Sequence, residues 1–477
     1  MPSKPPGKHG SARHGQGRRA DRGTHPNSGQ HSFGQPVPAG YPVRAMAVRL
    51  VSAVLDRGRA LDDALAVELA TGPGAGLEPR DRGLARLIAA TVLRRKGELE
   101  AVIGTFIGKP LPDDRGLLTP ILLCAAAQLV LLEIAPHAVL NIAVEQCRRD
   151  RGARRFDRLA NAVLRRTSER GREILAGLPG ARLDLPDWMW RRWVASYGEA
   201  TAEAIARASL VEAALDLSVR SAGDAADWAA RLGGTLLPAG TIRLTSPGVR
   251  VEELPGFSDG SWWVQDAAAA LPARLLGDVR GLHVADLCAA PGGKTAQLAS
   301  AGAHVTAVDI SPERLGRLRE NLARLKLTAG VVAADVETWQ PGRLFDAVLL
   351  DAPCTATGTI RRHPDIPHLK RATDLAPLVG LQARLLDRAV ALLRPGGRLV
   401  YCTCSLEPEE GADQIERLLA RCSTVERVPI DAVELPAGGE WQTPAGDLRT
   451  LPFHKPDARS EHGGMDGFYA ARMRRIS

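Results

Sequence analysis

The stretch GLHVADLCAAPGGKT, residues 281–295, decides the fold. Its first half is an apolar run typical of a buried β-strand, and a Gly-rich turn follows where that strand ends. Further apolar runs come after it, separated by stretches with helical periodicity: HVTAVDI, GVVAAD, FDAVLLDAPC and RLVYCTCS. Buried strands that alternate with helices predict a parallel sheet covered on both faces, so we expect an α/β Rossmann-like domain over residues 265–477.

Ligands of such folds bind beyond the carboxyl ends of the strands, so the residues that end each predicted strand are the candidate site. A Gly-rich turn between strand and helix lets the backbone approach a ligand closely and directs N–H groups at it. The turn after the first strand comprises Cys288, Ala289, Ala290, Pro291, Gly292, Gly293 and Lys294. The later strands end in Asp309, Asp335 and Asp351.

Three classes of ligand compete for this turn. A P-loop needs glycine five residues before Gly293, where the chain has Cys288, and a dinucleotide fingerprint needs GxGxxG. S-adenosylmethionine is the third, because its methionine part needs a close backbone rather than a phosphate nest. Asp309 lies 23 residues after Asp286, near the spacing of ~20 residues that places a carboxylate on ribose hydroxyls, and Asp335 is placed to accept from an adenine amino group. NAD would use the same carboxylate, and a single Asp there can also cap a helix.

Cysteines stand at the ends of two predicted strands, as Cys354 and as the pair Cys402 and Cys404. C5 of a pyrimidine is too weak a nucleophile to attack a sulfonium methyl group, but a thiolate added at C6 makes it enamine-like. The alternative is that these cysteines are small buried hydrophobes, which we favour for Cys402. A single Cys-x-Cys pair does not complete a zinc site, so no metal is expected.

The chain ahead of this domain divides into three parts. Residues 42–172 carry apolar stripes at three-and-four spacing and predict an all-helical domain. Residues 173–264 contain LDLSVR, DAADWAARLGG and TIRLT, which predict strand, helix and strand in a small α+β connector. Residues 1–41 are rich in Gly, Pro and His with little to bury, and predict a disordered basic tail.

Positive charge is concentrated in two segments of this chain of net charge +8. Residues 1–40 contain six basic residues against one acidic residue, which suits either a solvated tail or a nonspecific nucleic-acid tether. Residues 148–172 contain ten Arg against three acidic residues. Such a run of arginines usually forms a solvated helix face, but the density of arginine here favours a phosphate-contacting surface. The RNA-contact candidates there are Arg148, Arg149, Arg154 and Arg155.

Cysteine usage and hydropathy indicate a cytoplasmic protein. The seven cysteines are odd in number and form no repeated CxxC pattern, so free thiols are expected. The N-terminal segment has basic residues but no apolar core of a signal peptide. The longest apolar stretch, 121–135, is interrupted by Gln128 and Glu133 and is shorter than the ~20 residues that span a bilayer.

Three motifs together resemble the Sun-type RNA cytosine-C5 methyltransferases, in the bacterial form that carries a NusB-like helical domain in front. They are DLCAAPGGKT (286–295), DAPCTATGTIRRHPDI (351–366) and YCTCSLEPEEG (401–411). The helical part also resembles the NusB-like domain in DRGLARLIAATVLRR, HAVLNIAVEQCRR and FDRLANAVLRR. The stretch HLKRATDLAPL departs from the family, which more often has a Trp-Leu pair there, and this leaves the local RNA contact open.

The resemblance implies a role for each candidate. Cys404 would be the nucleophile, Cys354 would assist product release, and Asp351 would hold the cytosine near N3. The turn 288–294 would wrap the methionine part of S-adenosylmethionine, with Asp309 on the ribose and Asp335 near the adenine. Arg361 and Arg362 resemble cations that face RNA phosphate, although they could equally pair with Asp365 or Glu409.

The function implied is methylation of a cytosine C5 in ribosomal RNA, by resemblance the 16S species, before or during subunit assembly, by a monomer without a membrane partner. The target cytosine must leave its stack to reach Cys404. A transfer RNA substrate stays open, because related enzymes share the three motifs. A nonenzymatic, antitermination-like RNA-binding factor is the alternative from another class, and the presence of both Cys354 and Cys404 argues against it.

Overall fold

A computed structural model of the chain describes residues 37–477, apart from 246–247, 249, 437 and 457–462. The chain divides into two units, Met1–Pro38 and Ala39–Ser477, and the helices and strands of the described residues lie in the second. The basic tail predicted from the sequence lies outside the described residues as far as residue 36. Among the described residues, no helix combines the length and the apolar character needed to cross a bilayer.

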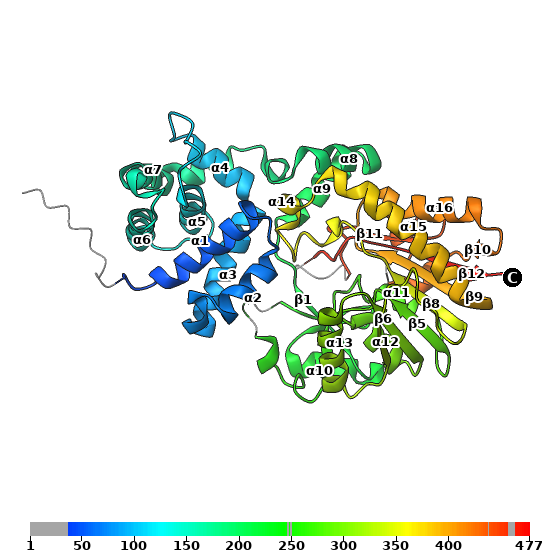
Figure 1. Cartoon of the computed structure of the whole chain (residues 1–477). Coiled ribbons are helices and arrows are strands. Elements are labelled where there is room, and N and C mark those ends of the chain that lie inside the picture. Colours follow the sequence, from blue (N-terminus) through cyan, green and yellow to red (C-terminus); the bar gives the residue numbers. More distant parts are fainter. Residues whose placement is uncertain (1–36, 246–247, 249, 437, 457–462) are drawn as a thin grey trace, which may run out of the picture. The chain divides into compact units, whose positions relative to one another are not determined.

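The N-terminal part of the second unit is all helical, as predicted (Figure 1). Prolines stand in the first turns of α1, α3 and α6, where their missing N–H costs no helical hydrogen bond. Helix α5 is buried along almost its whole length, and the apolar stripes of its neighbours pack around it in one core. The helices are α1 (Tyr41–Leu55), α2 (Leu61–Ala70), α3 (Pro79–Arg94), α4 (Lys96–Gly104), α5 (Leu118–Val130), α6 (Pro136–Arg149) and α7 (Asp157–Ala176).

The connecting part contains two helices and a small sheet. Helices α8 (Asp187–Tyr197) and α9 (Glu199–Ser209) precede an antiparallel sheet that has four strands among the described residues, in the order β2-β3-β1-β4. The predicted strand, helix and strand are confirmed as β1 (Leu215–Val219), α10 (Ala225–Leu232) and β3 (Ile242–Leu244). The other strands are β2 (Thr235–Leu236) and β4 (Trp262–Val264).

The C-terminal part is built on a sheet of eight strands among the described residues, in the order β10-β12-β9-β8-β5-β6-β7, with β11 paired to β12. The five strands from β5 to β9 run parallel to one another, as predicted. The sheet is nevertheless mixed, because β12 runs antiparallel to β9 and pairs with β10 and β11. The strands are β5 (His283–Leu287), β6 (His304–Asp309), β7 (Gly330–Ala333), β8 (Phe345–Asp351), β9 (Leu393–Thr403), β10 (Val425–Arg427), β11 (Leu448–Thr450) and β12 (Phe468–Arg475).

Helices cover both faces of this sheet (Figure 1). Helices α11 (Leu271–Arg274), α12 (Gly293–Ser300) and α13 (Pro312–Leu325) lie on one face, and α15 (Leu375–Leu392) and α16 (Ala412–Arg421) lie on the other. The short helix α14 (Ile366–Leu369) follows β8. The strand order reverses direction between β5 and β8, so their carboxyl ends form the crevice in which α/β folds bind ligands.

Candidate active site

The turn after β5 is held in shape by its own backbone and by the end of β6. Cys288 has a φ of 59° and Gly292 a φ of 102°, both in the left-handed region. A Cβ on Gly292 would lie 2.8 Å from Cγ of Leu318, so both the positive φ and the lack of space favour glycine at this position. The N–H of Ala290 donates to Oδ2 of Asp309 at 3.1 Å, which ties the turn to the neighbouring strand.

The strand-end aspartates differ in what they offer a ligand. Asp309 ends β6 with only 2% of the residue exposed, and its carboxylate also accepts from the N–H of Ser311 at 3.0 Å. Asp335 follows β7 and is exposed, with Oδ1 accepting from the N–H of Glu337 at 3.0 Å. Among the described residues, no hydrogen bond is made to Oδ2 of Asp335, so that oxygen is open to a ligand.

Asp351 ends β8 and lies between two side chains from neighbouring elements. Its Oδ2 accepts from Nζ of Lys294 at 2.7 Å, and its Oδ1 lies 3.4 Å from Sγ of Cys402. The Cys402 thiol is fully buried, as predicted, and burial together with the charge of Asp351 raises its pKa well above the usual range. About a third of the Asp351 side chain is exposed, so its carboxylate remains accessible beside the turn.

The two candidate catalytic cysteines meet beyond the ends of β8 and β9. Sγ of Cys354 lies 3.5 Å from Sγ of Cys404, within hydrogen-bond distance for a thiol pair, and both residues are partly exposed. The loop that carries Cys354 is fixed to the other strand, because the N–H of Gly358 donates to the carbonyl of Cys404 at 2.9 Å. A Cβ on Gly358 would lie 2.0 Å from the carbonyl oxygen of Gly467, so only glycine allows this approach.

The hydrogen bond between the thiols affects the pKa of Cys354. It raises the pKa of Cys354 well above the usual range, with burial and the charge of Cys404 acting in the same direction. Either sulfur atom can be the donor in this contact.

Asp286 lies under the turn as a fully buried carboxyl group. Burial raises its pKa to about 7, against the opposing hydrogen bond from Thr295. Its Oδ2 accepts from Oγ1 of Thr295 at 2.5 Å, whereas its Oδ1 is buried without a hydrogen-bond partner in the described part of the chain. The site therefore holds a group that titrates near neutrality beside the candidate cofactor turn.

The residues around the turn fit S-adenosylmethionine. Oδ2 of the exposed Asp335 is open to a donor such as the amino group of adenine, and the partly exposed carboxylate of Asp351 lies beside the turn. Among the described residues, no three His, Cys, Asp or Glu side chains are grouped to hold a metal ion.

Sequence reasoning missed the side chains that support the cysteine loops. The carboxylate of Glu407 is fully buried and accepts from Nε of Arg192 at 2.6 Å and from Nε1 of Trp193 at 3.0 Å, both on α8. The buried carboxylate of Glu410 accepts from the N–H of Thr355 at 3.0 Å. Glu407 and Glu410 lie in the motif 401–411, which was the available signal, but their partners lie far away in sequence.

Arg361 and Arg362 are less exposed than side chains that face RNA phosphate are expected to be. Arg362 pairs with Asp266 at 2.5 Å and with Asp466 at 2.9 Å, rather than with Asp365 or Glu409. Arg361 is 2% exposed, and Nε and Nη1 have no partner among the described residues. The Arg361 side chain is therefore buried and that of Arg362 is 22% exposed, and their contact with RNA stays a prediction.

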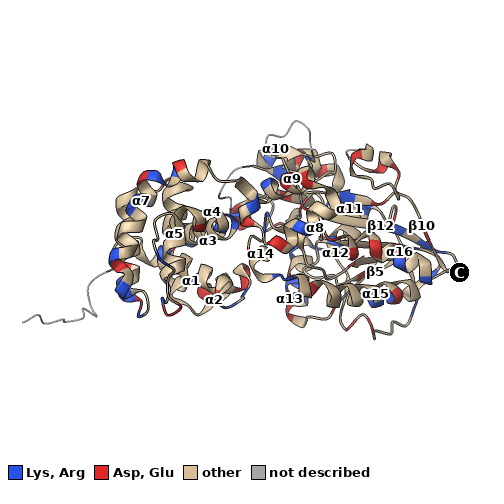
Figure 2. Ribbon diagram, turned by 90° about the horizontal axis from the view of Figure 1, so that it is seen from above, with Lys and Arg blue, Asp and Glu red and all other residues tan. Residues whose placement is uncertain are grey.

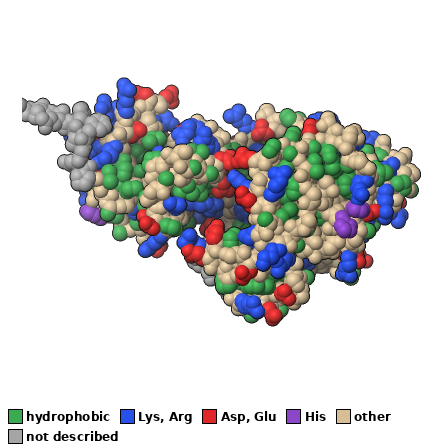
Figure 3. Space-filling model, turned by 60° about the horizontal axis from the view of Figure 1, so that its bottom comes forward, with side chains coloured by type: hydrophobic (Ala, Val, Ile, Leu, Met, Phe, Trp, Pro, Cys, Tyr) green, Lys and Arg blue, Asp and Glu red, His purple; other side chains and the backbone are tan. Residues whose placement is uncertain are grey.

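The candidate arginines of α6 and of the segment after it are exposed. Basic and acidic residues both occur along the neighbouring helix α7 (Figure 2). Arg148 pairs with Asp157 at 3.0 Å and Arg149 with Glu145 at 2.6 Å, while Arg155 pairs with Asp114. Arg154 makes no ion pair with a described residue. Figure 3 shows basic side chains interspersed with acidic ones on one face of the molecule. The structure does not bring these arginines to the cysteines.

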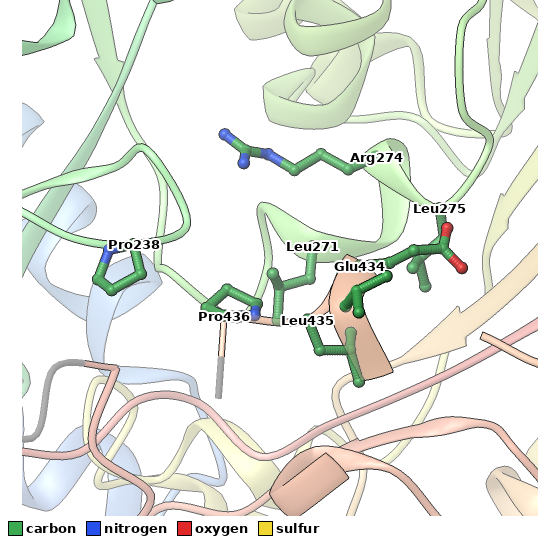
Figure 4. A pocket seen from close by; sticks show the side chains of 8 residues that line it. Pro238, Leu271, Arg274, Leu275, Glu434, Leu435 and Pro436 are labelled. Carbon is green, nitrogen blue, oxygen red and sulfur yellow. The ribbon is translucent and has the colours of Figure 1, made fainter. Parts of the chain in front are cut away.

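A separate pocket of about 170 Å³ lies away from the predicted site residues (Figure 4). Its lining includes Leu271, Leu275 and Leu435 together with the charged residues Arg274 and Glu434. None of the turn residues, strand-end aspartates or site cysteines lines it. The pocket therefore carries no part of the site described above.

Comparison with known proteins gives the family. A family model described as 16S rRNA methyltransferase RsmB/F matches residues 273–474, and a NusB family model matches residues 42–169. Ribosomal RNA small subunit methyltransferase B of Xanthomonas campestris pv. campestris is 38% identical over 408 residues, which cover 83% of this chain and 91% of that protein. The chain belongs to the RsmB/F family of 16S rRNA methyltransferases.

A second relative and two solved structures are also similar to this chain. The protein of the same name from Xylella fastidiosa is 38% identical over 450 residues, covering 91% of this chain and 98% of that protein. The crystal structure of PH0851 superposes with a TM-score of 0.67 at 21% identity, covering 92% of this chain and 100% of that chain. The structure of NSun6 from Pyrococcus horikoshii with SFG gives a TM-score of 0.51 at 18% identity, covering 61% of this chain and 98% of that chain. The two structures show the shared fold.

Proposed function

We propose that this member of the RsmB/F family transfers a methyl group from S-adenosylmethionine to C5 of a cytosine in 16S rRNA, through a covalent bond between Cys404 and C6 of the base. The observation that carries the proposal is the 3.5 Å separation of the Cys354 and Cys404 sulfur atoms. Methylation of an amino group has no use for a cysteine nucleophile, whereas methylation at C5 needs one thiol to add and a base to finish the reaction.

The chain's own residues divide the work. The Cys404 thiolate attacks C6, and Asp351, held by Lys294, would orient the ring edge near N3. Bound S-adenosylmethionine supplies the electrophilic methyl group that C5 takes up. The backbone of Cys288–Lys294 would hold its methionine part, with Asp309 and Asp335 at the ribose and adenine.

Cys354 can act as the general base once Cys404 is bonded to the cytosine. In the free pair, the hydrogen bond and the charge of Cys404 keep the pKa of Cys354 high. Once the sulfur of Cys404 is bonded to C6, both of these causes disappear, and Cys354 gives up its proton more readily. Its thiolate then removes the proton from C5, the C5=C6 double bond forms, and the C6–S bond breaks with its electrons returning to Cys404.

Bisulfite sequencing of RNA tests the substrate. We expect cells without this protein to lose a methylcytosine in 16S rRNA, which the wild-type chain restores and Cys404→Ala does not. Loss of a methylcytosine in transfer RNA alone would replace the substrate, and no loss in either RNA would remove the activity. In vitro, Cys354→Ala should accumulate a gel-stable RNA adduct that Cys404→Ala lacks.

A further inference from the structure

Buried polar side chains join the two cysteine loops at the residues that follow Cys354 and Cys404. Thr355 follows Cys354 in the chain and Ser405 follows Cys404. Oγ1 of Thr355 lies 3.1 Å from Oγ of Ser405, so the two loops are hydrogen-bonded at the positions next to the cysteines. Thr355, Ser405 and Glu410 are each 0% exposed, and solvent does not compete for these bonds.

Glu410 ends this network, and only donors face its carboxylate. The N–H of Thr355 donates to Oε1 at 3.0 Å, the Thr355 hydroxyl donates to Oε2, and Nε2 of Gln382 donates to Oε1 at 3.0 Å. No Lys or Arg among the described residues forms an ion pair with it. Three donors on one carboxylate match its ionised form, which accepts only.

The acceptor at one end gives the hydroxyl groups a direction. Because Thr355 gives its proton to Glu410, its oxygen accepts from the Ser405 hydroxyl. The oxygen of Ser405 accepts in turn from the N–H of Glu407 at 3.0 Å. A chain of donors therefore runs from the Cys404 loop through Thr355 into the carboxylate.

The backbone of Glu410 is itself anchored to the sheet. Its carbonyl accepts from the Tyr401 hydroxyl at 2.7 Å and from Oγ1 of Thr403 at 3.2 Å, both on β9. Gln382 on α15 also donates to the carbonyl of Pro353 at 2.8 Å, next to Cys354. The backbone of Glu410 is thus held to β9, and its carboxylate contacts the loop that carries Cys354.

We propose that Glu410 is a positioning residue, which holds the Cys354 thiol opposite Cys404 through Thr355 and Ser405 so that the methylated base is released. The proposal rests on the proposed function. In release, Cys354 takes the C5 proton while the C6–S bond breaks, and this transfer needs the two sulfur atoms on one base ring at once. A loosened Cys354 loop slows release more than it slows the attack by Cys404.

Threonine variants test this with little change in packing. Thr355→Val removes the hydroxyl and keeps the shape, and Thr355→Ser keeps the hydroxyl. Thr359→Val is the matched control, since among the described residues the Thr359 hydroxyl bonds only to the carbonyl of Ala356 in its own loop, at 2.9 Å. We expect Thr355→Val to lose about ten-fold in kcat, or about 1.4 kcal/mol, with KM for RNA and cofactor within two-fold and a covalent RNA adduct accumulating. Thr355→Ser and Thr359→Val should keep kcat within two-fold.

Unchanged kcat in Thr355→Val, or a loss confined to KM, overturns the proposal. Glu410→Gln is the second variant. Its amide must turn an NH₂ group toward one of three donors, so we expect a larger loss of kcat with the same adduct. Thr355→Val keeps the test decisive if Glu410→Gln does not fold.

A readout without RNA separates this proposal from the proposed function. Diamide oxidises two adjacent thiols to a disulfide and takes up their two electrons and two protons. We expect Thr355→Val to form the Cys354–Cys404 disulfide about ten-fold more slowly than Thr359→Val, as followed by mass spectrometry. Slower oxidation in a protein that methylates no cytosine would remove the proposed function and keep the positioning role, whereas equal oxidation rates would remove the positioning role.

Discussion

Nζ of Lys294 lies 2.7 Å from Oδ2 of Asp351, although 57 positions separate the two residues in the chain. Lys294 stands in the first turn of α12, after the Gly-rich turn, and Asp351 ends β8. Burial alone would lower the pKa of Lys294, but the charge and hydrogen bond of Asp351, together with the nearby Cys402 and Cys404, outweigh burial and hold the pKa above the ordinary value. The pair therefore keeps a charged lysine and an oriented carboxylate at the junction of the cofactor turn and the cysteine loops.

Replacing Lys294 by Met should reduce kcat by about 100-fold. Removing one partner of a largely buried pair leaves the Asp351 carboxylate uncompensated, which typically costs about 3 kcal/mol, and Asp351 can then turn away from the base. Steady-state kinetics and calorimetry with S-adenosylhomocysteine measure the effect. Lys326→Met, at an exposed lysine, is the control. An unchanged kcat with weaker cofactor binding would confine Lys294 to the cofactor.

The sequence predicted the site where local patterns suffice. Each predicted strand places a chemistry-bearing residue at its carboxyl end, so Lys294, Cys354 and Cys404 could be assigned to one edge of the sheet, where Asp351 contacts Lys294 and Cys354 contacts Cys404. Local patterns do not report strand order, and the antiparallel β12 beside β9 was therefore missed.

Partners distant in the chain were equally invisible. The sequence predicts Arg362 as a cation that faces RNA phosphate. In the structure it forms ion pairs with Asp266 and Asp466. The same holds for Glu410, whose three donors belong to Thr355 and Gln382. Only the folded chain shows which motif residues remain partly exposed and which are buried beneath them.

Helix α8 supports the loop after Cys404, and Arg192→Met should destabilise the protein by about 2 kcal/mol. The variant leaves the buried Glu407 carboxylate with only Trp193, but the Arg192 side chain is 30% exposed, so the cost stays below that of a fully buried pair. Urea unfolding followed by tryptophan fluorescence measures it. Arg191→Met, which removes a 79% exposed side chain, should leave stability unchanged. Equal stabilities for both variants would remove the proposed support.

Asp286 should make stability depend on pH. Its pKa is raised to about 7 in the fold, against about 4 in an unfolded chain, so the folded state holds the proton more tightly between these values. This contribution is complete below about pH 4 and is lost as pH rises toward 7. We expect Asp286→Asn to gain stability relative to the wild type from pH 5 to pH 8, measured by urea unfolding at both values. A constant difference would show that Asp286 has an ordinary pKa.

The arginines of the helical part should contribute unequally to RNA binding. Arg154 has no ion pair among the described residues, whereas Arg155 already pairs with Asp114. A phosphate contact releases about one counterion, so Arg154→Ala should lower the slope of log K against log salt by about 1. Arg155→Ala should change the slope less, because an arginine must leave its carboxylate to bind phosphate. Filter binding of a 16S rRNA fragment across salt concentrations measures both, and equal slopes for the wild type and Arg154→Ala would place the RNA on another surface.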